Sequence, residues 1–519
     1  MVDSAQNESA SAVITTPAQV QRETRKVLLL QIARQVVAIS SAAALYRLLG
    51  PEPFGLYGMV IPLLMLPRMA ATLGLSTAAV QSEHLSVDQR SAIFHVTVLL
   101  GMAAALFTGG LGHLFSRIYQ VPDLIWISWL FAGTTVVDAF GLTHLAGLQR
   151  NLKLGRIAGI RLFSQTLAAM VAIVVAVQVS HQVLTMGIFA LIAMEYTQLG
   201  VNTLGYWWSG KWWPGKLVRI EMKQLLAFGG NYSLSSLVFY AGQNLDKVIL
   251  AVVLGSTQSG QRFLGMYTAM YNLMMKPVYF VTDPVTSVML PSLSRARSKP
   301  LDYRRIATEF YRFTAILLIP AGIGLAVVSS DVVALISGPG WGEASAMLLV
   351  LAPAICVHGL INISGSLLAS IGQTGRLLAA ASILLLIQVQ GYGAAYWLTT
   401  HFEFGADVSA DRAVSIAVAT SYSLVLIVCM LPYLAFCFSR VGLAIGPIAF
   451  EFAQILGRSM LMGVSVWFVQ DLMVSSAWSI YLRLPLAMGV GIATYSILMW
   501  SRIKQSVMPF LVRGYEVQS

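Results

Sequence analysis

The sequence predicts an all-α polytopic membrane protein, with about fourteen transmembrane helices in two pseudo-symmetric six-helix lobes and a C-terminal helix pair. The first reason is composition: the 519 residues are 57% hydrophobic and only 11% charged, whereas soluble domains carry about 25% charged residues. The second reason is that apolar segments of about 20 residues, the length that crosses a bilayer, recur along the chain. The third reason is an internal repeat that relates the two halves of the chain.

The expected spans follow one another with short connections. In the first half they cover residues 27–49, 54–81, 91–115, 121–148, 157–179 and 183–206. In the second half they cover 222–254, 262–293, 306–337, 343–371, 378–400 and 411–438, and a last pair covers 451–471 and 478–502. Since no loop is long enough to hold a folded domain, we expect the function to lie within the bilayer.

The division into domains follows from these spans. We expect a disordered cytoplasmic tail over residues 1–22, an N-terminal lobe over 23–206 and a C-terminal lobe over 222–440, with an extra helix pair and tail over 441–519. Residues 207–221 begin WWSGKWWPGK, and such interleaving of tryptophan and lysine is typical of a segment at the membrane surface. It is therefore expected to be an interfacial linker between the lobes.

The net charge of +11 reflects topology rather than a nucleic-acid partner. Most of the 33 Lys and Arg residues fall on loops of one side of the membrane, and the positive-inside rule makes that side cytoplasmic, together with both termini. The three cysteines, Cys356, Cys429 and Cys437, all lie in apolar spans. They predict neither a disulfide framework nor a metal site, and no cofactor is expected.

An internal repeat connects the two halves. Gly55, Tyr57 and Pro67 match Gly265, Tyr267 and Pro277 at one constant spacing, and each proline has a cation beside it, Arg68 or Lys276. Repeated halves with proline-interrupted helices in corresponding positions are typical of transporters whose site lies between the halves. Tyr57 and Tyr267 are expected to be interface anchors for the two hairpins.

Several segments resemble the polysaccharide transport family. They are YRLLGPEPFGLYG (46–58), LDKVILAVVLG with LGMYTAMYNL, MLPSLSRA (289–296), and GPGWGEASAMLLVLAPA with GSLLASIGQTGR. Members of that family are Wzx-type flippases of O-antigen, capsule and exopolysaccharide repeat units. They belong to the multidrug/oligosaccharidyl-lipid/polysaccharide exporter superfamily, which also contains multidrug and toxin extrusion pumps.

The resemblance implies two six-helix lobes around a central cavity in a bacterial inner membrane. The implied cargo is an undecaprenyl-pyrophosphate-linked oligosaccharide, moved from the inner to the outer leaflet. Membrane lipids, a polysaccharide polymerase and a chain-length regulator are the implied partners.

Cations inside the spans are the candidate substrate-binding residues. A charge near the bilayer centre costs about 2.5–3.5 kcal/mol on insertion scales, so it is expected to face a cavity or a partner. Arginine and lysine there would give a pyrophosphate charge-assisted hydrogen bonds in a low-dielectric site. The candidates are Arg68, Lys276, Arg34, Arg161 and Arg312.

Helical spacing puts Lys276 on a polar stripe with Asn272, Tyr279, Asp283 and Thr286. The alternative for these cations is internal ion pairing that holds helices together, such as Lys276 with Asp283 or Arg34 with Asp138. Arg161 and Arg312 lie near enough to the cytoplasmic surface to extend toward it.

Intramembrane carboxylates and prolines complete the candidate site. The carboxylates of Asp138, Glu195, Asp246 and Asp283 either carry a coupling proton or sodium ion or neutralise the nearby cations. The prolines at 67, 277 and 284 are either hinges for alternating access or sources of plain helix curvature. His358 is expected to be a hydrogen-bonded packing histidine, with a proton relay as the alternative.

Three function classes remain in comparison. The first is the flippase. The second is an ion-coupled exporter of small amphipathic cations on the same scaffold, against which the intramembrane Arg and Lys residues argue. The third is a membrane glycosyltransferase or polymerase, which would require a catalytic carboxylate or an Arg-rich external loop. Because no nucleophile–base pair, metal cluster or nucleotide-binding loop is found in the sequence, we expect no enzymatic activity.

Overall fold

In the computed structural model, the described residues (17–72, 86–151, 153–179, 184–216, 223–402 and 408–506) form helices and short connections, without a strand. The all-α membrane fold predicted from composition is thus confirmed. The expected tail up to residue 16 and the end of the expected linker, 217–221, lie outside the described residues.

The first half of the chain contains α1 (Pro17–Leu49), α2 (Glu52–Thr72), α4 (Val87–Tyr119), α5 (Leu124–Arg150), α6 (Leu154–Val179), the 3-10 turn η2 (Leu184–Gly187) and α7 (Ile188–Gly210). The second half begins with α8 (Lys223–Leu254), α9 (Gln258–Ala296), α10 (Pro300–Val327) and α11 (Ser329–Ser337). It continues with α12 (Ala344–Leu351), η3 (Ala352–Ala354), α13 (Ile355–Ser370), α14 (Thr374–His401) and α15 (Ala410–Ser439), and ends with α16 (Ile445–Ser475) and α17 (Ile480–Ser506).

Twelve helical segments of the described chain are long and apolar enough to cross a membrane. Of the fourteen expected spans, the two outside this set correspond to α7 and α9. Length is not the reason, because α7 has 23 residues and α9 has 39. Both helices carry the polar and ionisable residues that the sequence singled out, which lowers their hydropathy and makes them the natural walls of a polar site.

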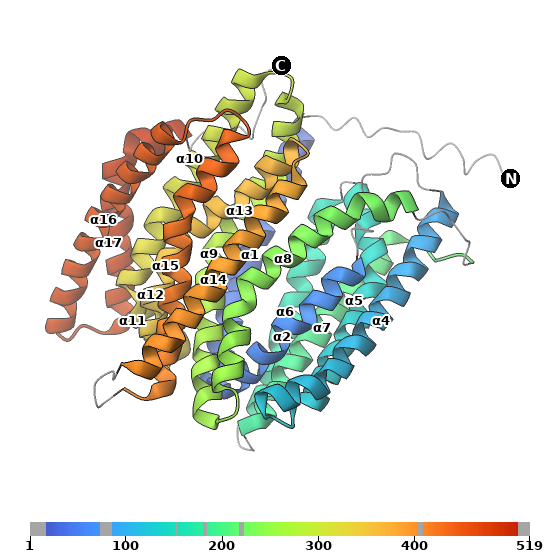
Figure 1. Cartoon of the computed structure of the whole chain (residues 1–519), viewed down its shortest axis with the longest axis horizontal. Helices are drawn as coiled ribbons and strands as arrows, with labels where there is room; N and C mark the ends of the chain where they lie inside the picture. Colours follow the sequence, from blue (N-terminus) through green and yellow to red (C-terminus); the bar gives the residue numbers. More distant parts are fainter. Residues whose placement is uncertain are drawn as a thin grey trace.

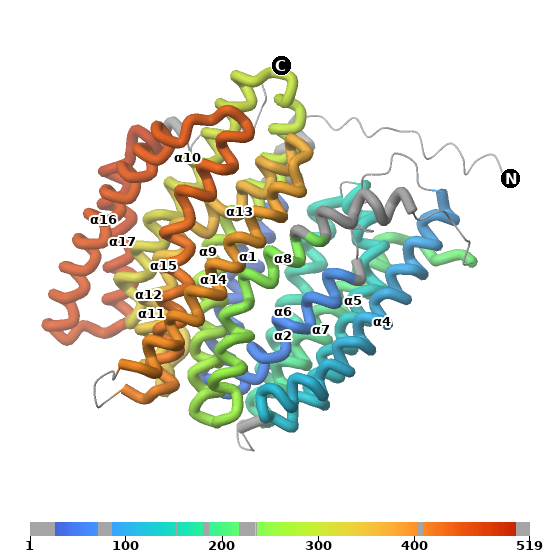
Figure 2. Tube along the Cα trace, in the orientation of Figure 1, coloured from blue at the N-terminus to red at the C-terminus, as the bar shows by residue number. Residues whose placement is uncertain are grey.

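The helices form three groups in space (Figure 1). Helices α2 and α4–α7 lie together, with α1 packed along α6; α8–α15 form the middle, and α16 with α17 stands at the far edge against α10. The Cα trace shows that α2 and α8 lie where the first group meets the second (Figure 2).

The two copies of the internal repeat cross each other. A Cβ added at Gly55 would lie 2.1 Å from the carbonyl oxygen of Gln261, and one added at Gly265 would lie 1.8 Å from that of Pro51. Only glycine allows two helix backbones to approach this closely. The repeat therefore marks the contact that joins α2 of the first half to α9 of the second.

Two details of the hairpins differ from expectation. Both helices continue through their prolines, so α2 contains Pro62 and Pro67 and α9 contains Pro277, Pro284 and Pro291 without interruption. Tyr267 is not an anchor at the membrane surface, because it is fully buried and donates a hydrogen bond to Asp246. Interior prolines are tolerated in membrane helices where neighbouring groups or cavity water can satisfy the carbonyls that they free.

Candidate functional site

Three cations and one carboxylate from both halves of the chain are connected by electrostatic interactions that centre on Arg34. Arg34 of α1 interacts with Arg161 of α6 and with Asp283 and Lys276 of α9. We call this set of four residues the cation cluster. It has three positive groups against one negative group, so its net character is cationic.

The cations of this cluster have few protein partners. The Arg161 guanidinium donates to the Tyr206 hydroxyl at 3.2 Å. Within the described residues, the side chains of Arg34 and Lys276 form no hydrogen bond or ion pair, and the anticipated pair of Lys276 with Asp283 is not formed. Donors held in place without acceptors are what an incoming anion requires.

The fold of α9 explains how Lys276 and Asp283 come to this position. Thr257 caps the helix by accepting the Gly260 N–H at 3.0 Å, which fixes where its helical register begins. From there one face, including Met274 and Met275, is buried in the second half of the chain. The polar stripe lies on the accessible face, and its interactions with Arg34 and Arg161 show that this face is turned toward the first half.

Arg68 has a different environment from the cation cluster. Its guanidinium donates from Nε to Oδ2 of Asp138 at 3.1 Å, with Nη2 at 2.7 Å from the same oxygen, and Nη1 lies 3.5 Å from Oε1 of Glu195. We call these three residues, from α2, α5 and α7, the N-terminal ion cluster. Asp138, weighed from sequence as a partner of Arg34, pairs with Arg68 instead.

Asp246 belongs to a buried pair in the second half. Its carboxylate accepts hydrogen bonds from the Tyr267 hydroxyl and from the Lys247 backbone N–H, and it lies 3.9 Å from the Lys247 ammonium. That ammonium also donates to Asn244 at 3.0 Å and lies 3.4 Å from the centre of the Tyr271 ring. Lys247 therefore already supplies the compensating charge that a buried carboxylate needs.

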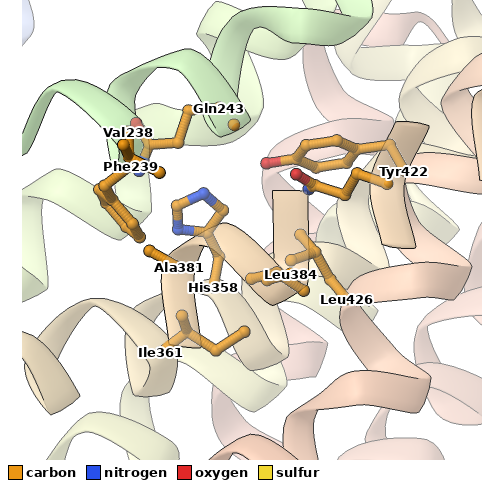
Figure 3. A pocket seen from close by; sticks show the side chains of 11 residues that line it. Val238, Phe239, Gln243, His358, Ile361, Ala381, Leu384, Tyr422 and Leu426 are labelled. Atoms are coloured by element: carbon orange, nitrogen blue, oxygen red, sulfur yellow. The ribbon is translucent and has the colours of Figure 1, made fainter. Parts of the chain in front are cut away.

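A small pocket adjoins this pair, between α8, α13, α14 and α15 (Figure 3). Its walls are mainly apolar, and Gln243, His358 and Tyr422 supply polar groups. His358 is 3% exposed, and its Nδ1 has no hydrogen-bond partner within the described part of the chain. The imidazole is buried among helices, as expected of a packing histidine, but within the described residues its Nδ1 does not form the hydrogen bond that was expected with it.

Arg312 lies apart from the cation cluster. It donates to both carboxylate oxygens of Glu451 on α16, and Arg502 of α17 lies 3.3 Å from the same carboxylate. A second peripheral set joins Asp331 of α11 to Gln470 and Arg483 of the C-terminal pair. These contacts were not predicted from the sequence, because they join residues that lie between 51 and 152 positions apart.

Metal binding has no support in the described residues, in which no group of three or more His, Cys, Asp or Glu side chains could hold a metal ion. Pro67 precedes Arg68 on α2, and Pro277 and Pro284 follow Lys276 and Asp283 on α9. The prolines thus lie next to residues of the N-terminal ion cluster and of the cation cluster.

Comparison with known proteins agrees with this architecture. A family model of polysaccharide biosynthesis proteins matches residues 44–346. The lipopolysaccharide biosynthesis protein WzxC of Escherichia coli (strain K12) is 24% identical over 333 residues, 63% of this chain and 64% of that protein. The teichuronic acid biosynthesis protein TuaB of Bacillus subtilis (strain 168) is 22% identical over 367 residues, 64% of this chain and 72% of that protein.

A Klebsiella pneumoniae membrane protein in the cps region is 23% identical over 337 residues, 64% of this chain and 67% of that protein. The matched part thus spans about two thirds of these relatives' length.

Solved structures extend the similarity of fold to nearly the whole chain. The lipid II flippase MurJ in an inward closed conformation has a TM-score of 0.68 at 14% identity, covering 92% of this chain and 99% of that one. An inward-facing multidrug resistance transporter of the MATE family has a TM-score of 0.56 at 13% identity, covering 80% and 99%. The resemblance inferred from the sequence motifs is confirmed: the chain belongs to the family of polysaccharide biosynthesis proteins, and it has the fold of MurJ and of the MATE transporters.

Proposed function

We propose that this protein is a flippase that carries undecaprenyl-pyrophosphate-linked oligosaccharide repeat units across the bacterial cytoplasmic membrane for surface polysaccharide biosynthesis. Its family and the names of its relatives support a polysaccharide pathway. One observation carries the proposal: three cations, Arg34, Arg161 and Lys276, converge from both halves of the chain and are only partly satisfied by described protein groups.

The cation cluster suits a pyrophosphate because two kinds of donor are present. Guanidinium groups offer paired N–H donors in a planar fork, and an ammonium adds a compact charge with three rotatable donors. In a cavity of low dielectric each charge-assisted hydrogen bond is stronger than in water. Asp283 offsets one of the three positive charges. This weakens the binding of the pyrophosphate, so that the headgroup could be released after transport.

Transport then requires only that the cation cluster is open first to one side of the membrane and then to the other. In the proposed cycle the pyrophosphate and glycan enter from the cytoplasm between the two halves, while the polyprenyl tail stays in lipid. The halves rock about the α2–α9 crossing and expose the headgroup to the other side. The prolines of α2 and α9 are the proposed hinges. No covalent bond changes, so we propose a transporter and not an enzyme.

The N-terminal ion cluster is the proposed place of ion coupling. Two carboxylates share one guanidinium, and Glu195, at 3.5 Å, is held less closely than Asp138, at 2.7 Å. A carboxylate with a weaker partner in a poorly hydrated site is the one that protonates more readily. We propose Glu195 as the proton carrier, in preference to Asp246, whose charge Lys247 already balances.

An ion-coupled exporter of amphipathic cations is the rival function. Its substrate would be repelled by the net positive cation cluster, since like charges in a low-dielectric site are costly. A susceptibility panel of a deletion strain separates the two: unchanged drug tolerance with loss of surface glycan supports the flippase.

The test in cells replaces Arg34 and Lys276 together. We expect Arg34→Gln/Lys276→Gln to abolish surface polysaccharide while leaving the amount of protein in the membrane unchanged, because neither side chain forms a hydrogen bond or ion pair with a described residue. The control is Arg305→Gln, which removes an arginine that is 70% exposed. Normal surface glycan in the double variant would refute the proposed site.

A further inference from the structure

A second charged site lies outside the cation cluster, between α4 and α5 at the end where α5 finishes. It is a small pocket, and its polar lining comes from Arg90, Thr143, Arg150 and Asn151. Arg90 and Arg150 lie within electrostatic range of each other. The pocket therefore has a basic lining, in which the guanidinium of Arg90 is the group without an acceptor among the described residues.

Arg90 is held in place but has no acceptor. Its guanidinium carbon lies 4.3 Å from the centre of the Trp212 ring, and a Cβ added at Gly147 would lie 2.5 Å from its Nη2. Trp212 on one side and the bare backbone of Gly147 on the other thus fix the guanidinium plane. Its N–H groups form no hydrogen bond with any residue that the structure describes. A planar fork of donors in this state matches the oxygens of a phosphate.

A buried hydroxyl in the same pocket is also unsatisfied. Thr143 is 4% exposed, and its Oγ1 has no hydrogen-bond partner among the described residues. Burying a hydroxyl without a partner is unfavourable, because the group loses its hydrogen bonds to water, so a ligand or water that accepts it stabilises the site. A phosphate oxygen between Arg90 and Arg150 would accept this hydroxyl.

The pocket lies at the depth of lipid headgroups. The segment after α7 folds over it: the Gly215 N–H donates to Ser91 at 2.9 Å, and the His144 Nε2 lies 3.1 Å from the Trp212 carbonyl oxygen. The side chains of Trp208, in the last turn of α7, and Trp213, in the segment after it, are 86% and 78% exposed. Exposed tryptophans of a membrane protein concentrate at the membrane–water interface.

An apolar surface continues from this level toward the middle of the membrane. Leu99 on α4 is 69% exposed and Phe140 on α5 is 38% exposed. A molecule with a phosphate in the pocket could therefore lay acyl chains along these two helices. A free phosphate ion would leave that apolar surface unused.

We propose that this pocket binds the phosphate group of an anionic membrane phospholipid, with its acyl chains along α4 and α5. The positive-inside rule puts the pocket in the cytoplasmic leaflet, whose anionic lipids are attracted to basic pockets between membrane helices. The bound lipid would anchor the segment from Trp207 to Lys216 against α4 and α5.

The test measures lipid retained by the purified full-length protein and its thermal midpoint. The protein is reconstituted with phosphatidylglycerol, with phosphatidylcholine, or with phosphatidylcholine plus inorganic phosphate, then washed with detergent. We expect phosphatidylglycerol alone to be retained and to raise the thermal midpoint. Arg90→Ala should reduce retention about tenfold, a typical effect of losing a charge-assisted contact.

Matched variants separate the loss of this lipid site from a general loss of surface charge and from misfolding. Arg156→Ala removes an exposed arginine of the same surface and should retain phosphatidylglycerol as the wild type does. Thr143→Val keeps the charge of the pocket and the shape of the side chain, and it should still weaken retention of phosphatidylglycerol. This variant therefore tests the proposal even if Arg90→Ala fails to fold. Equal retention by Arg90→Ala, Thr143→Val and Arg156→Ala would overturn the proposal. Equal protection by inorganic phosphate would assign the pocket to a soluble anion and overturn the lipid assignment.

Discussion

Intramembrane cations of this chain fall into two groups according to their partners. Arg68 and Arg312 are held by carboxylates, through Asp138 with Glu195 and through Glu451. Arg34 and Lys276 have no such partner within the described residues, and Arg161 donates to a tyrosine. Substitution should consequently affect different properties in the two groups. Replacing a cation of the first group should lower the stability of the protein, and replacing one of the second group should reduce transport.

Arg68→Ala should destabilise the protein by about 3–5 kcal/mol, because it leaves two largely buried carboxylates without their cation. The measurement is unfolding of the purified protein in detergent, beside Lys276→Gln, which should unfold at the wild-type midpoint. Restoration of stability in Arg68→Ala/Asp138→Ala/Glu195→Ala would tie the loss to the unpaired carboxylates. An unchanged midpoint for Arg68→Ala would contradict the ion pairing.

Glu195→Gln should remove the dependence of transport on a proton gradient. The amide can still accept the Arg68 hydrogen bond, so the fold should be kept, but it cannot gain or lose a proton. The check is the transport rate in vesicles with and without an imposed pH difference. Asp138→Asn is the comparison, and retained gradient dependence in Glu195→Gln would show that the proton is carried elsewhere.

At the scale of elements, the α2–α9 crossing joins the two halves. It depends on the repeat glycines Gly55 and Gly265, where backbone meets backbone. The distance that a Cβ would have to Pro51, 1.8 Å, is far inside van der Waals contact. No rotation of a side chain relieves that overlap, since the neighbouring atom is a main-chain oxygen.

Gly265→Ala should therefore separate α2 from α9 and lower the yield of folded protein severely. Gly200→Ala is the matched control, because a Cβ there meets no atom within 4 Å and alanine favours a helix over glycine by about 1 kcal/mol. The yield of monodisperse protein on size-exclusion chromatography measures the effect of both substitutions. Wild-type yield of Gly265→Ala would mean that the helices do not cross at this glycine.

The sequence predicted these elements well and their contacts poorly. Apolar length determines where a span lies, and the spacing of Lys276 and Asp283 placed both on one face of α9. Spacing does not determine which neighbouring helix that face meets. The partners of Arg68 lie 70 and 127 positions further along the chain, so Asp138 could be assigned only once three helices were packed.

At the scale of the whole molecule, polarity and position go together. The two long helices outside the set of twelve apolar spans, α7 and α9, carry Glu195 on one side and Lys276 with Asp283 on the other. The C-terminal pair is joined to the second half through Glu451 and Asp331, away from the cation cluster. We infer that α16 and α17 support the second half, and that the passage for the headgroup lies between the halves.

Translocation in proteoliposomes tests the central claim most directly. The purified protein would be reconstituted with a polyprenyl-pyrophosphate-linked oligosaccharide, and glycan delivered across the bilayer would be measured by cleavage with a glycosidase present on the far side only. We predict that the wild type and Arg305→Gln deliver glycan and that Arg34→Gln/Lys276→Gln slows delivery at least about tenfold, the effect of about 1.4 kcal/mol. Equal rates for the double variant and the wild type, or equal delivery of the same glycan on a lipid without the pyrophosphate, would contradict a cationic site for the headgroup.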